Sequence, residues 1–196
     1  MAAVHAGQRR FLPGPFVEIR HADPVRDAAA CAAIYRPFVT DTVISLEERP
    51  PDSAEIARRI EQISARYPWL VAQEGGSVVG YAYASQHRER AGYRWAADVA
   101  VYIAEDHQGQ GVGRALYREL LALLARQGLR HACAGIGLPN PASVALHESC
   151  GFQLVGIYRR IGRKMGAWQD VGWWQLELPG SDPPAEPLPP PRLGQA

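Results

Sequence analysis

The chain has 196 residues, 47% of them hydrophobic, and a formal net charge of +1, which fits one domain of ordinary size with a real core. A near-neutral charge without a basic stripe disfavours nucleic acid and anionic membranes as main partners. The three cysteines lack paired spacing and the six histidines lack ligand spacing, so we expect neither a disulfide framework nor a metal site.

No segment of the sequence is long and apolar enough to span a membrane. The basic pair Arg9-Arg10 is followed by prolines and charged residues rather than by the apolar region of an export signal, and we therefore expect a cytoplasmic protein. Residues 1–15 contain no periodic run, and residues 179–196 are rich in proline. We expect both ends to be disordered, with a single domain spanning residues 16–178.

Hydrophobic periodicity predicts a domain in which helices interleave with strands. In chain order the predicted elements are a strand at 16–20, helices at 23–38 and 53–67, strands at 69–73, 78–85 and 94–104, a helix at 111–127, a strand at 131–137, a helix at 141–149, and strands at 152–160 and 170–178. Asp23, ahead of Pro24, is the expected cap of the first helix, and Ser53 that of the second. The Gly75-Gly76 turn predicts a hairpin, and a sheet with both hairpins and crossovers is mixed.

The most informative segment joins the strand at 94–104 to the helix at 111–127 and reads Gln108-Gly109-Gln110-Gly111-Val112-Gly113. Glycines let backbone amides approach a ligand closely, and the free N–H groups at a helix start favour an anion. The pattern therefore predicts a phosphate cradle. Its glycine spacing excludes the dinucleotide fingerprint, and the absence of a following Lys-Ser or Lys-Thr excludes the nucleotide-triphosphate loop. From these residues alone, a turn that merely connects two elements remains the alternative.

This segment resembles the Gln/Arg-x-x-Gly-x-Gly/Ala signature of the GNAT superfamily of acetyl-CoA-dependent N-acetyltransferases. A helix that starts at Asn140 and ends at Gly151-Phe152 is similar to a second block of that family. Three further stretches resemble the phosphinothricin N-acetyltransferase branch, namely Arg66–Ala72, Gly135–Asn140 and Trp168–Leu176. The resemblance runs from about residue 19 to residue 178 and covers the predicted domain.

The resemblance implies the GNAT fold, an α/β (α+β) architecture with a mixed central sheet of about six to seven strands and about four flanking helices. It also implies acetyl-CoA as co-substrate and a homodimer. The strand is expected to open after Asp98, so that backbone groups of residues 101–103 pair with the pantetheine arm. The implied coenzyme-binding residues are Val101, Tyr102, Ile103, Gly109, Gln110, Gly111, Val112, Gly113, Arg114 and Asn140.

Acyl transfer from a thioester to an amine needs a base for the ammonium and an acid for the departing thiolate. The family uses a Glu on the strand before the cradle, and this chain has the shorter Asp98 there, which favours a relaying water. The family's usual acid is a Tyr four residues before the helix-ending glycine, and this position holds His147. From the residues alone, Asp98 could be an edge charge and His147 a histidine without a role. No paired nucleophile is evident, so direct attack in a ternary complex is expected.

Two arginines in the loop at 86–90 could bind the carboxylate of an amino-acid substrate. Arg90, and then Arg88, are the expected substrate-binding residues, with solvated loop charges as the alternative. The expected reaction is acetylation of the α-amine of a small amino acid or analogue, of the phosphinothricin, methionine sulfone or sulfoximine type. The alternatives are a protein N-terminal or lysine acetyltransferase, and a catalytically weak acetyl-CoA sensor.

Overall fold

The structure is a computed structural model that describes residues 17–193. Within that range it contains strands β1 (Glu18–His21), β2 (Trp69–Glu74), β3 (Ser77–Gln86), β4 (Ala96–Ile103), β5 (His131–Leu138), β6 (Gln153–Lys164) and β7 (Ala167–Glu177), helices α1 (Ala28–Thr40), α2 (Ser53–Ser64), α3 (Val112–Gln127) and α4 (Pro141–Ser149), and short 3₁₀ turns η1 (Ala91–Tyr93) and η2 (Glu105–His107). The N-terminal extension predicted at 1–15 lies outside the described residues.

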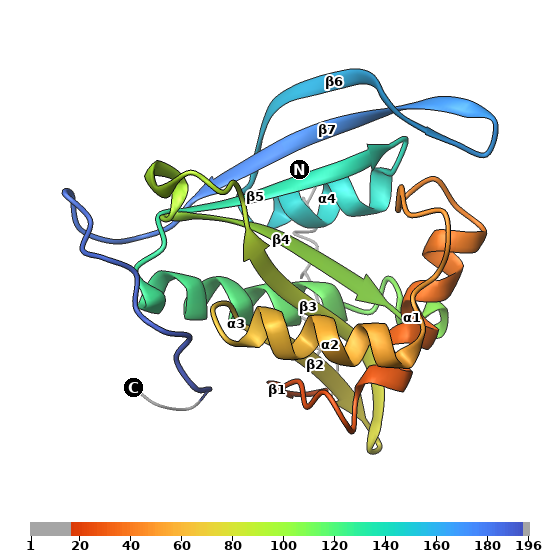
Figure 1. The fold of residues 1–196 in the computed structure, drawn as a ribbon, viewed down its shortest axis with the longest axis horizontal. Helices are drawn as coiled ribbons and strands as arrows, with labels where there is room; N and C mark the ends of the chain where they lie inside the picture. The colour runs from red at the N-terminus through yellow and green to blue at the C-terminus, as the bar shows by residue number, and fades with distance from the viewer. Residues whose placement is uncertain (1–16, 194–196) are drawn as a thin grey trace, which may run out of the picture.

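The described strands form one seven-stranded sheet in the order β1-β2-β3-β4-β5-β7-β6 (Figure 1). Of its neighbouring pairs, β4 and β5 run parallel and the others antiparallel. The prediction of a mixed sheet of six to seven strands with about four helices is therefore confirmed. No helix within residues 17–193 is long and apolar enough to cross a membrane.

Helices cover both faces of the sheet (Figure 1). Along β2, Trp69 and Val71 pack with α1 and α2, whereas Leu70 and Ala72 pack with α3. Because successive strand side chains alternate between faces, this continuous apolar run serves two cores. The apolar positions of α3 point into the larger core, which explains their helical spacing in the sequence.

Both early helix caps differ from the prediction. α1 begins at Ala28 rather than near Asp23, because the Asp23 carboxylate accepts the N–H groups of a preceding turn, Val25 at 2.9 Å and Arg26 at 2.8 Å. The N-cap of α2 is Asp52 rather than Ser53, and its side chain accepts the N–H of Glu55 at 2.8 Å. Neighbouring polar residues can compete for a cap. The N-cap of α1 is Asp27, four residues after the predicted Asp23, and that of α2 is one residue before the predicted Ser53.

The described part of the proline-rich tail, residues 179–193, contains no helix or strand and makes several contacts with the domain. The disorder expected of it stays a prediction. The indole of Trp95 donates to the carbonyl of Ala185 at 2.8 Å, and Arg94 donates twice to Glu186, at 2.6 and 2.7 Å. The backbone N–H of Leu188 also donates to the carbonyl of Gln127 at 2.7 Å, so the segment is held through backbone and side-chain groups.

The sheet opens beside Asp98. The parallel register of β4 with β5 covers only Ala96–Asp98, after which β4 stays paired with β3 alone up to Ile103. β5 continues on its other side along β7. The expected divergence after Asp98 is therefore confirmed, and the edge of residues 99–103 that faces β5 has no ladder partner in the described structure.

Candidate active site

Two hollows adjoin where β4 and β5 diverge. The larger, of about 330 Å³, lies against the sheet and is walled by the loop between α1 and α2, residues 41–52. The narrower, of about 60 Å³, runs between β4 and β5 toward α3 and α4. Both are lined by residues of the two diverging strands, namely Val99, Ala100, Tyr102, Gly135 and Gly137. We refer to them as the cavity and the channel.

The α1–α2 loop closes on β5 at a glycine. A Cβ on Gly137 would lie 2.9 Å from the carbonyl oxygen of Val43 and 3.1 Å from that of Ile44. Only a residue without a side chain allows this approach. The glycines of the Gly135–Asn140 stretch thus shape the cavity, which gives that sequence resemblance a physical reason.

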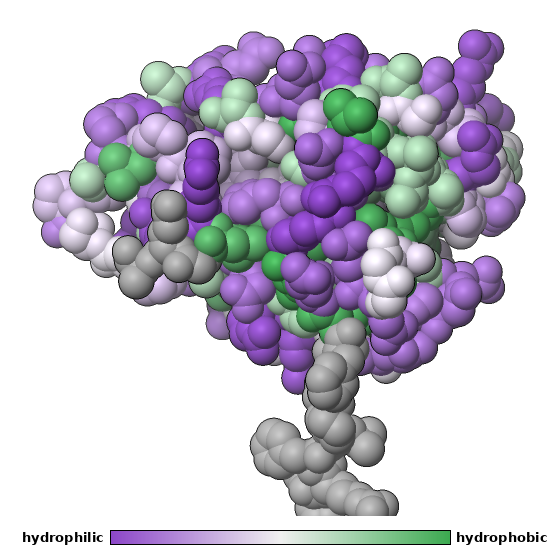
Figure 2. All heavy atoms as spheres, turned by 90° about the horizontal axis from the view of Figure 1, so that it is seen from below, coloured by the Kyte–Doolittle hydropathy of each residue, from purple (hydrophilic) through white to green (hydrophobic). Residues whose placement is uncertain are grey.

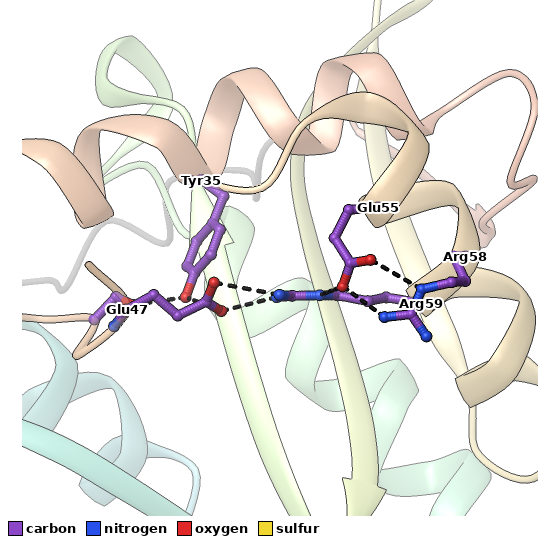
Figure 3. Close-up of polar contacts among 6 residues, drawn as sticks. Tyr35, Glu47, Glu55, Arg58 and Arg59 are labelled. Carbon is purple, nitrogen blue, oxygen red and sulfur yellow. Dashed lines mark hydrogen bonds and ion pairs between the residues drawn. The ribbon is translucent and has the colours of Figure 1, made fainter. Parts of the chain in front are cut away.

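Polar side chains anchor the same loop from three elements. Tyr35 of α1 lies with its hydroxyl 2.6 Å from Ser45 Oγ, and it donates to Glu47 at 3.1 Å. Arg59 of α2 reaches the Glu47 carboxylate at 2.8 and 3.2 Å, as Figure 3 shows. The ammonium of Lys164, from β6, donates to the carbonyl of Ser45. The loop wall is thus held from behind by groups outside the cavity.

Asp98 lines the cavity and forms a hydrogen bond with His87, the residue that follows β3. His87 Nδ1 is 2.6 Å from Asp98 Oδ1. Burial raises the pKa of Asp98, while the His87 hydrogen bond and the charge of Arg88 act in the opposite direction. The sequence analysis found Asp98 but missed His87, because the two are eleven positions apart and meet only through strand pairing.

Cys133 lies directly across from Asp98 on β5. Burial raises the pKa of its thiol to about 11, so the group is neutral at physiological pH. Ligand-type atoms of His87, Asp98 and Cys133 lie within 4.8 Å of one another. The expectation of no metal stays a prediction.

His147 is buried on α4 and lines the channel. Its Nδ1 lies 2.7 Å from the carbonyl of Ser143, which can only accept, so Nδ1 carries a proton. Its Nε2 lies 2.9 Å from the hydroxyl of Tyr117, from α3. Burial lowers the pKa of His147, which favours the neutral ring. Both ring nitrogens are therefore engaged, and Tyr117 lines the channel beside His147.

Two glycines of the glycine loop have left-handed backbone conformations. Gly109 and Gly111 have φ values of +71° and +88°, and Gly111 is the N-cap of α3. Because Gly111 has no side chain, the N-cap residue itself places no side-chain atoms in front of the first amides of α3. Gly113 has a packing reason as well, since a Cβ there would lie 3.0 Å from Leu146 Cδ2 of α4. The exposed Arg114 lies in the first turn of the helix.

Polar side chains of the glycine loop and of Asn140 have local partners. Gln108 donates to the carbonyl of Ile103 at 3.1 Å, and Gln110 donates to that of Asp106 at 2.6 Å, so both fix the loop. The side chain of Asn140 caps α4 by accepting the N–H of Ser143 at 3.1 Å, and the same residue lines the channel. Asn140 therefore caps α4, and its position in the channel lining is compatible with a coenzyme contact.

The structure separates the two loop arginines. The guanidinium carbon of Arg88 lies 5.6 Å from the ring centre of Trp173, a residue that lines the cavity. Arg90 is the exposed N-cap residue of η1, and no contact of its side chain with the cavity is described. Neither arginine is among the lining residues of the cavity, but Arg88 contacts one of them, Trp173. The substrate-binding role expected of Arg90 and Arg88 stays a prediction.

Comparisons with known proteins identify the family. The family model described as "Acetyltransferase (GNAT) domain" matches residues 21–173. The phosphinothricin N-acetyltransferase of Streptomyces viridochromogenes is 40% identical over 174 residues, 88% of this chain and 94% of its own. The L-methionine sulfoximine/L-methionine sulfone acetyltransferase of Salmonella typhimurium is 37% identical, over 82% of this chain and 94% of its own.

A solved structure has a similar fold. The GNAT superfamily phosphinothricin acetyltransferase from Sinorhizobium meliloti, in complex with AcCoA, superposes with a TM-score of 0.79 at 38% identity. The match covers 83% of this chain and 88% of that one. The chain therefore belongs to the GNAT family and is an acetyl-CoA-dependent N-acetyltransferase.

Proposed function

We propose that this enzyme transfers the acetyl group of acetyl-CoA to the α-amino group of a small amino acid or amino-acid analogue. The observation that carries the proposal is the junction of the cavity with the channel beside Asp98. A cavity of about 330 Å³ suits a small substrate rather than a protein segment. The relatives named for phosphinothricin and for methionine sulfoximine or sulfone support the same substrate class.

The acetyl-CoA side of the site is built from backbone. The unpaired edge of β4 at 101–103 suits the pantetheine amides, and the N-terminus of α3 after Gly111 suits the pyrophosphate. Asn140, at the channel, would meet the pantetheine arm. The thioester supplies an activated acetyl group at the point where the channel meets the cavity.

Asp98 is the base for the substrate ammonium. An N–H bond of the ammonium breaks, an O–H bond forms on the carboxylate, and the freed lone pair attacks the thioester carbonyl carbon. The C–N bond then forms, and collapse of the tetrahedral intermediate breaks the C–S bond. Since Asp is shorter than Glu, a single water can carry the proton from the amine to Asp98.

Tyr117 and His147 serve the departing thiolate as a pair. His147 cannot donate from Nε2 while its ring is neutral, because Nδ1 already carries the proton. The hydroxyl of Tyr117 lies 2.9 Å from that nitrogen, and both residues line the channel. As the C–S bond breaks, the O–H bond of the phenol breaks and an S–H bond forms on the departing thiolate. A proton from solvent water then returns to the phenolate through Nε2 of His147.

Arg88 orients the substrate. A guanidinium over Trp173 at the cavity wall can bind the α-carboxylate in two-point fashion. A carboxylate held there and an amine at Asp98 would fix both ends of a free amino acid. Arg90 stays a second candidate from the sequence.

The enzyme is also proposed to be a homodimer. β6, β7 and the turn between them expose apolar side chains, namely Leu154, Val155, Ile157, Tyr158, Ile161, Met165 and Trp168. Figure 2 shows that the face on the far side from this hairpin is largely hydrophilic. An exposed apolar surface of this kind indicates an interface. Light scattering of the wild type and of Val155→Asp would test it, with a monomeric wild type contradicting the proposal.

A cytoplasmic location stays a prediction from the sequence.

A thiol-release assay tests the reaction. Purified enzyme and acetyl-CoA are combined with phosphinothricin, methionine sulfone, methionine sulfoximine, the common amino acids, and an N-terminal and a lysine peptide. We expect release with free amino acids or their analogues and little with peptides. Release that depends on a peptide would favour the protein acetyltransferase, and acetyl-CoA binding without any release would favour a sensor.

A further inference from the structure

His87 and Asp98 form a fixed pair at the rim of the cavity. Ser85 of β3 is paired with Asp98 of β4, and His87 follows Ser85 by two positions, so it returns to the same sheet face. Its Nδ1 lies 2.6 Å from Asp98 Oδ1. The imidazole edge-packs on Tyr93 at 5.8 Å and on Trp173 at 6.0 Å between ring centres. Its side chain is 15% exposed, so the ring has little freedom to turn away.

The loop backbone holds the imidazole in place as well. Arg88 donates to the carbonyl of His87 at 2.9 Å, and the side chain of Gln86 donates to the carbonyl of Arg88 at 2.9 Å. Two hydrogen bonds within three residues fix the start of this loop. The distance between His87 and Asp98 is therefore set by β3, β4 and the loop together.

The ionisable groups around Asp98 leave it few sources of stabilisation. Those that face it are Tyr67, Tyr83, His87, Arg88 and Cys133. Burial raises the pKa of Tyr83 to about 12 and that of Cys133 to about 11, and it raises the pKa of Tyr67. These three groups are neutral at physiological pH. Only His87 and Arg88 oppose the desolvation of the Asp98 carboxylate.

The two oxygens of Asp98 have different surroundings. Oδ1 accepts from His87, and no hydrogen bond to Oδ2 is described within residues 17–193. Asp98 itself lines the cavity, whereas His87 is not among the lining residues. A base must be ionised to accept a proton, and a half-buried carboxylate is ionised more readily when it accepts a hydrogen bond.

We propose that His87 is the positioning residue of the catalytic base. It donates from Nδ1 to Oδ1, keeps the Asp98 carboxylate ionised and leaves Oδ2 to take the proton of the substrate ammonium. The N–H bond of the ammonium breaks and an O–H bond forms at Oδ2, while the Nδ1 proton stays on His87. This inference rests on the proposed role of Asp98 as the base.

Two variants at position 87 distinguish the effect of the hydrogen bond from the effect of the packed ring. His87→Phe keeps an aromatic ring between Tyr93 and Trp173 but removes the donor. His87→Asn places an amide N–H where Nδ1 was, so it keeps the donor without a group that titrates. The measurements are the pH profile of kcat/KM and a ¹³C NMR titration of the Asp98 carboxyl carbon, with circular dichroism as the folding control.

We expect His87→Phe to move the Asp98 titration and the acidic limb of kcat/KM upward by about one pH unit, since a hydrogen bond to a charged group and one pKa unit are of similar size in free energy. At pH values below that limb, kcat/KM of His87→Phe is then about tenfold lower than that of the wild type. On the plateau the two differ by less than about threefold. His87→Asn keeps the limb of the wild type.

Two results would overturn the inference. An unmoved Asp98 titration in His87→Phe would make His87 a packing residue. A limb that moves equally in His87→Asn and His87→Phe would show that the ring itself takes the proton. Asp98→Asn distinguishes both results from a failure of the proposed function. If Asp98→Asn keeps full activity, Asp98 is not the base. The NMR titration of Asp98 in the wild type and in His87→Phe still reports whether His87 controls the ionisation of that carboxyl group.

Discussion

The hydroxyl of Tyr117 lies 2.9 Å from Nε2 of His147, and the two side chains come from different helices that meet under the channel. Burial raises the pKa of Tyr117 well above its usual value and lowers that of His147. Both groups are thus neutral in the resting enzyme. A neutral His147 has no proton on Nε2 to give. The hydroxyl of Tyr117, rather than His147, is therefore the group that donates a proton to the thiolate.

Tyr117→Phe should lower kcat about 10²-fold, the lower end of the usual effect of a general acid. The phenyl ring fills the same space, so packing with α4 is kept. The acetyl-CoA Kd from calorimetry should change by less than about threefold, because the hydroxyl acts on the leaving group. A kcat within about twofold of the wild type would remove Tyr117 from the mechanism.

His147→Gln is the companion variant. A glutamine amide can still accept from the Tyr117 hydroxyl but cannot hold an extra proton. We expect a smaller fall in kcat than in Tyr117→Phe and an acidic pH dependence that differs from the wild type. His147→Ala would instead leave a buried hydroxyl without a partner, which costs about 1–3 kcal/mol of stability. A thermal melt distinguishes these effects from a catalytic loss.

The sequence predicted the parts of this site that depend on neighbours along the chain. The glycine loop, the strand that contains Asp98 and the start of α4 at Asn140 all have local signals. His87 and Tyr117 were missed because their significance comes from partners 11 and 30 positions away. A histidine just after a strand and a tyrosine on the apolar face of a helix look ordinary until register and helix packing bring them to the site.

Gly111→Val should weaken acetyl-CoA binding. A branched side chain at φ +88° is strained and stands where the pyrophosphate must approach. The matched control is Gly76→Val, in the β2–β3 turn at φ +86° with open space around it. Both variants should lose stability by a similar amount, and only Gly111→Val should raise the acetyl-CoA Kd, by about tenfold or more. Equal affinities by calorimetry would exclude the cradle.

Arg88→Ala should lower kcat/KM for amino-acid substrates by about ten- to a hundredfold, the usual effect of losing a charged hydrogen bond. Arg90→Ala is the matched control from the same loop and should change kcat/KM less. Decarboxylated amines should be poor substrates of the wild type and show little further loss in Arg88→Ala. The opposite order of the two variants would restore the assignment to Arg90.

Asp98→Asn keeps the shape of the side chain but removes the proton acceptor. We expect kcat to fall about 10²-fold or more, with the acetyl-CoA Kd nearly unchanged because Asp98 lines the cavity rather than the narrow channel. Because burial raises the pKa of Asp98 in the wild type, the base is competent only above that raised value, and activity falls as the pH drops through it. The variant should lose this acidic limb.

Glu47 and Glu55 offer a matched pair at the loop wall, since Arg59 lies 2.8 Å from a carboxylate oxygen of each. Only Glu47 belongs to the α1–α2 loop, while Glu55 is on the surface of α2 and also pairs with Arg58 (Figure 3). Glu47→Gln weakens the loop anchor at Arg59 and Tyr35. Partly exposed ion pairs are worth about 1 kcal/mol or less, so the effect on overall stability should be small.

Glu47→Gln should raise the KM of the amine substrate more than Glu55→Gln does. A cavity wall that is about 1 kcal/mol less ordered raises the KM of the amine about fivefold, while the KM of acetyl-CoA stays within about twofold. Glu55→Gln keeps the loop anchored and should leave both KM values near those of the wild type. If the two variants raise the amine KM equally, the contact of Glu47 with Arg59 does not hold the cavity wall in place. The close approach of the α1–α2 loop to Gly137 would then be the contact that shapes the cavity.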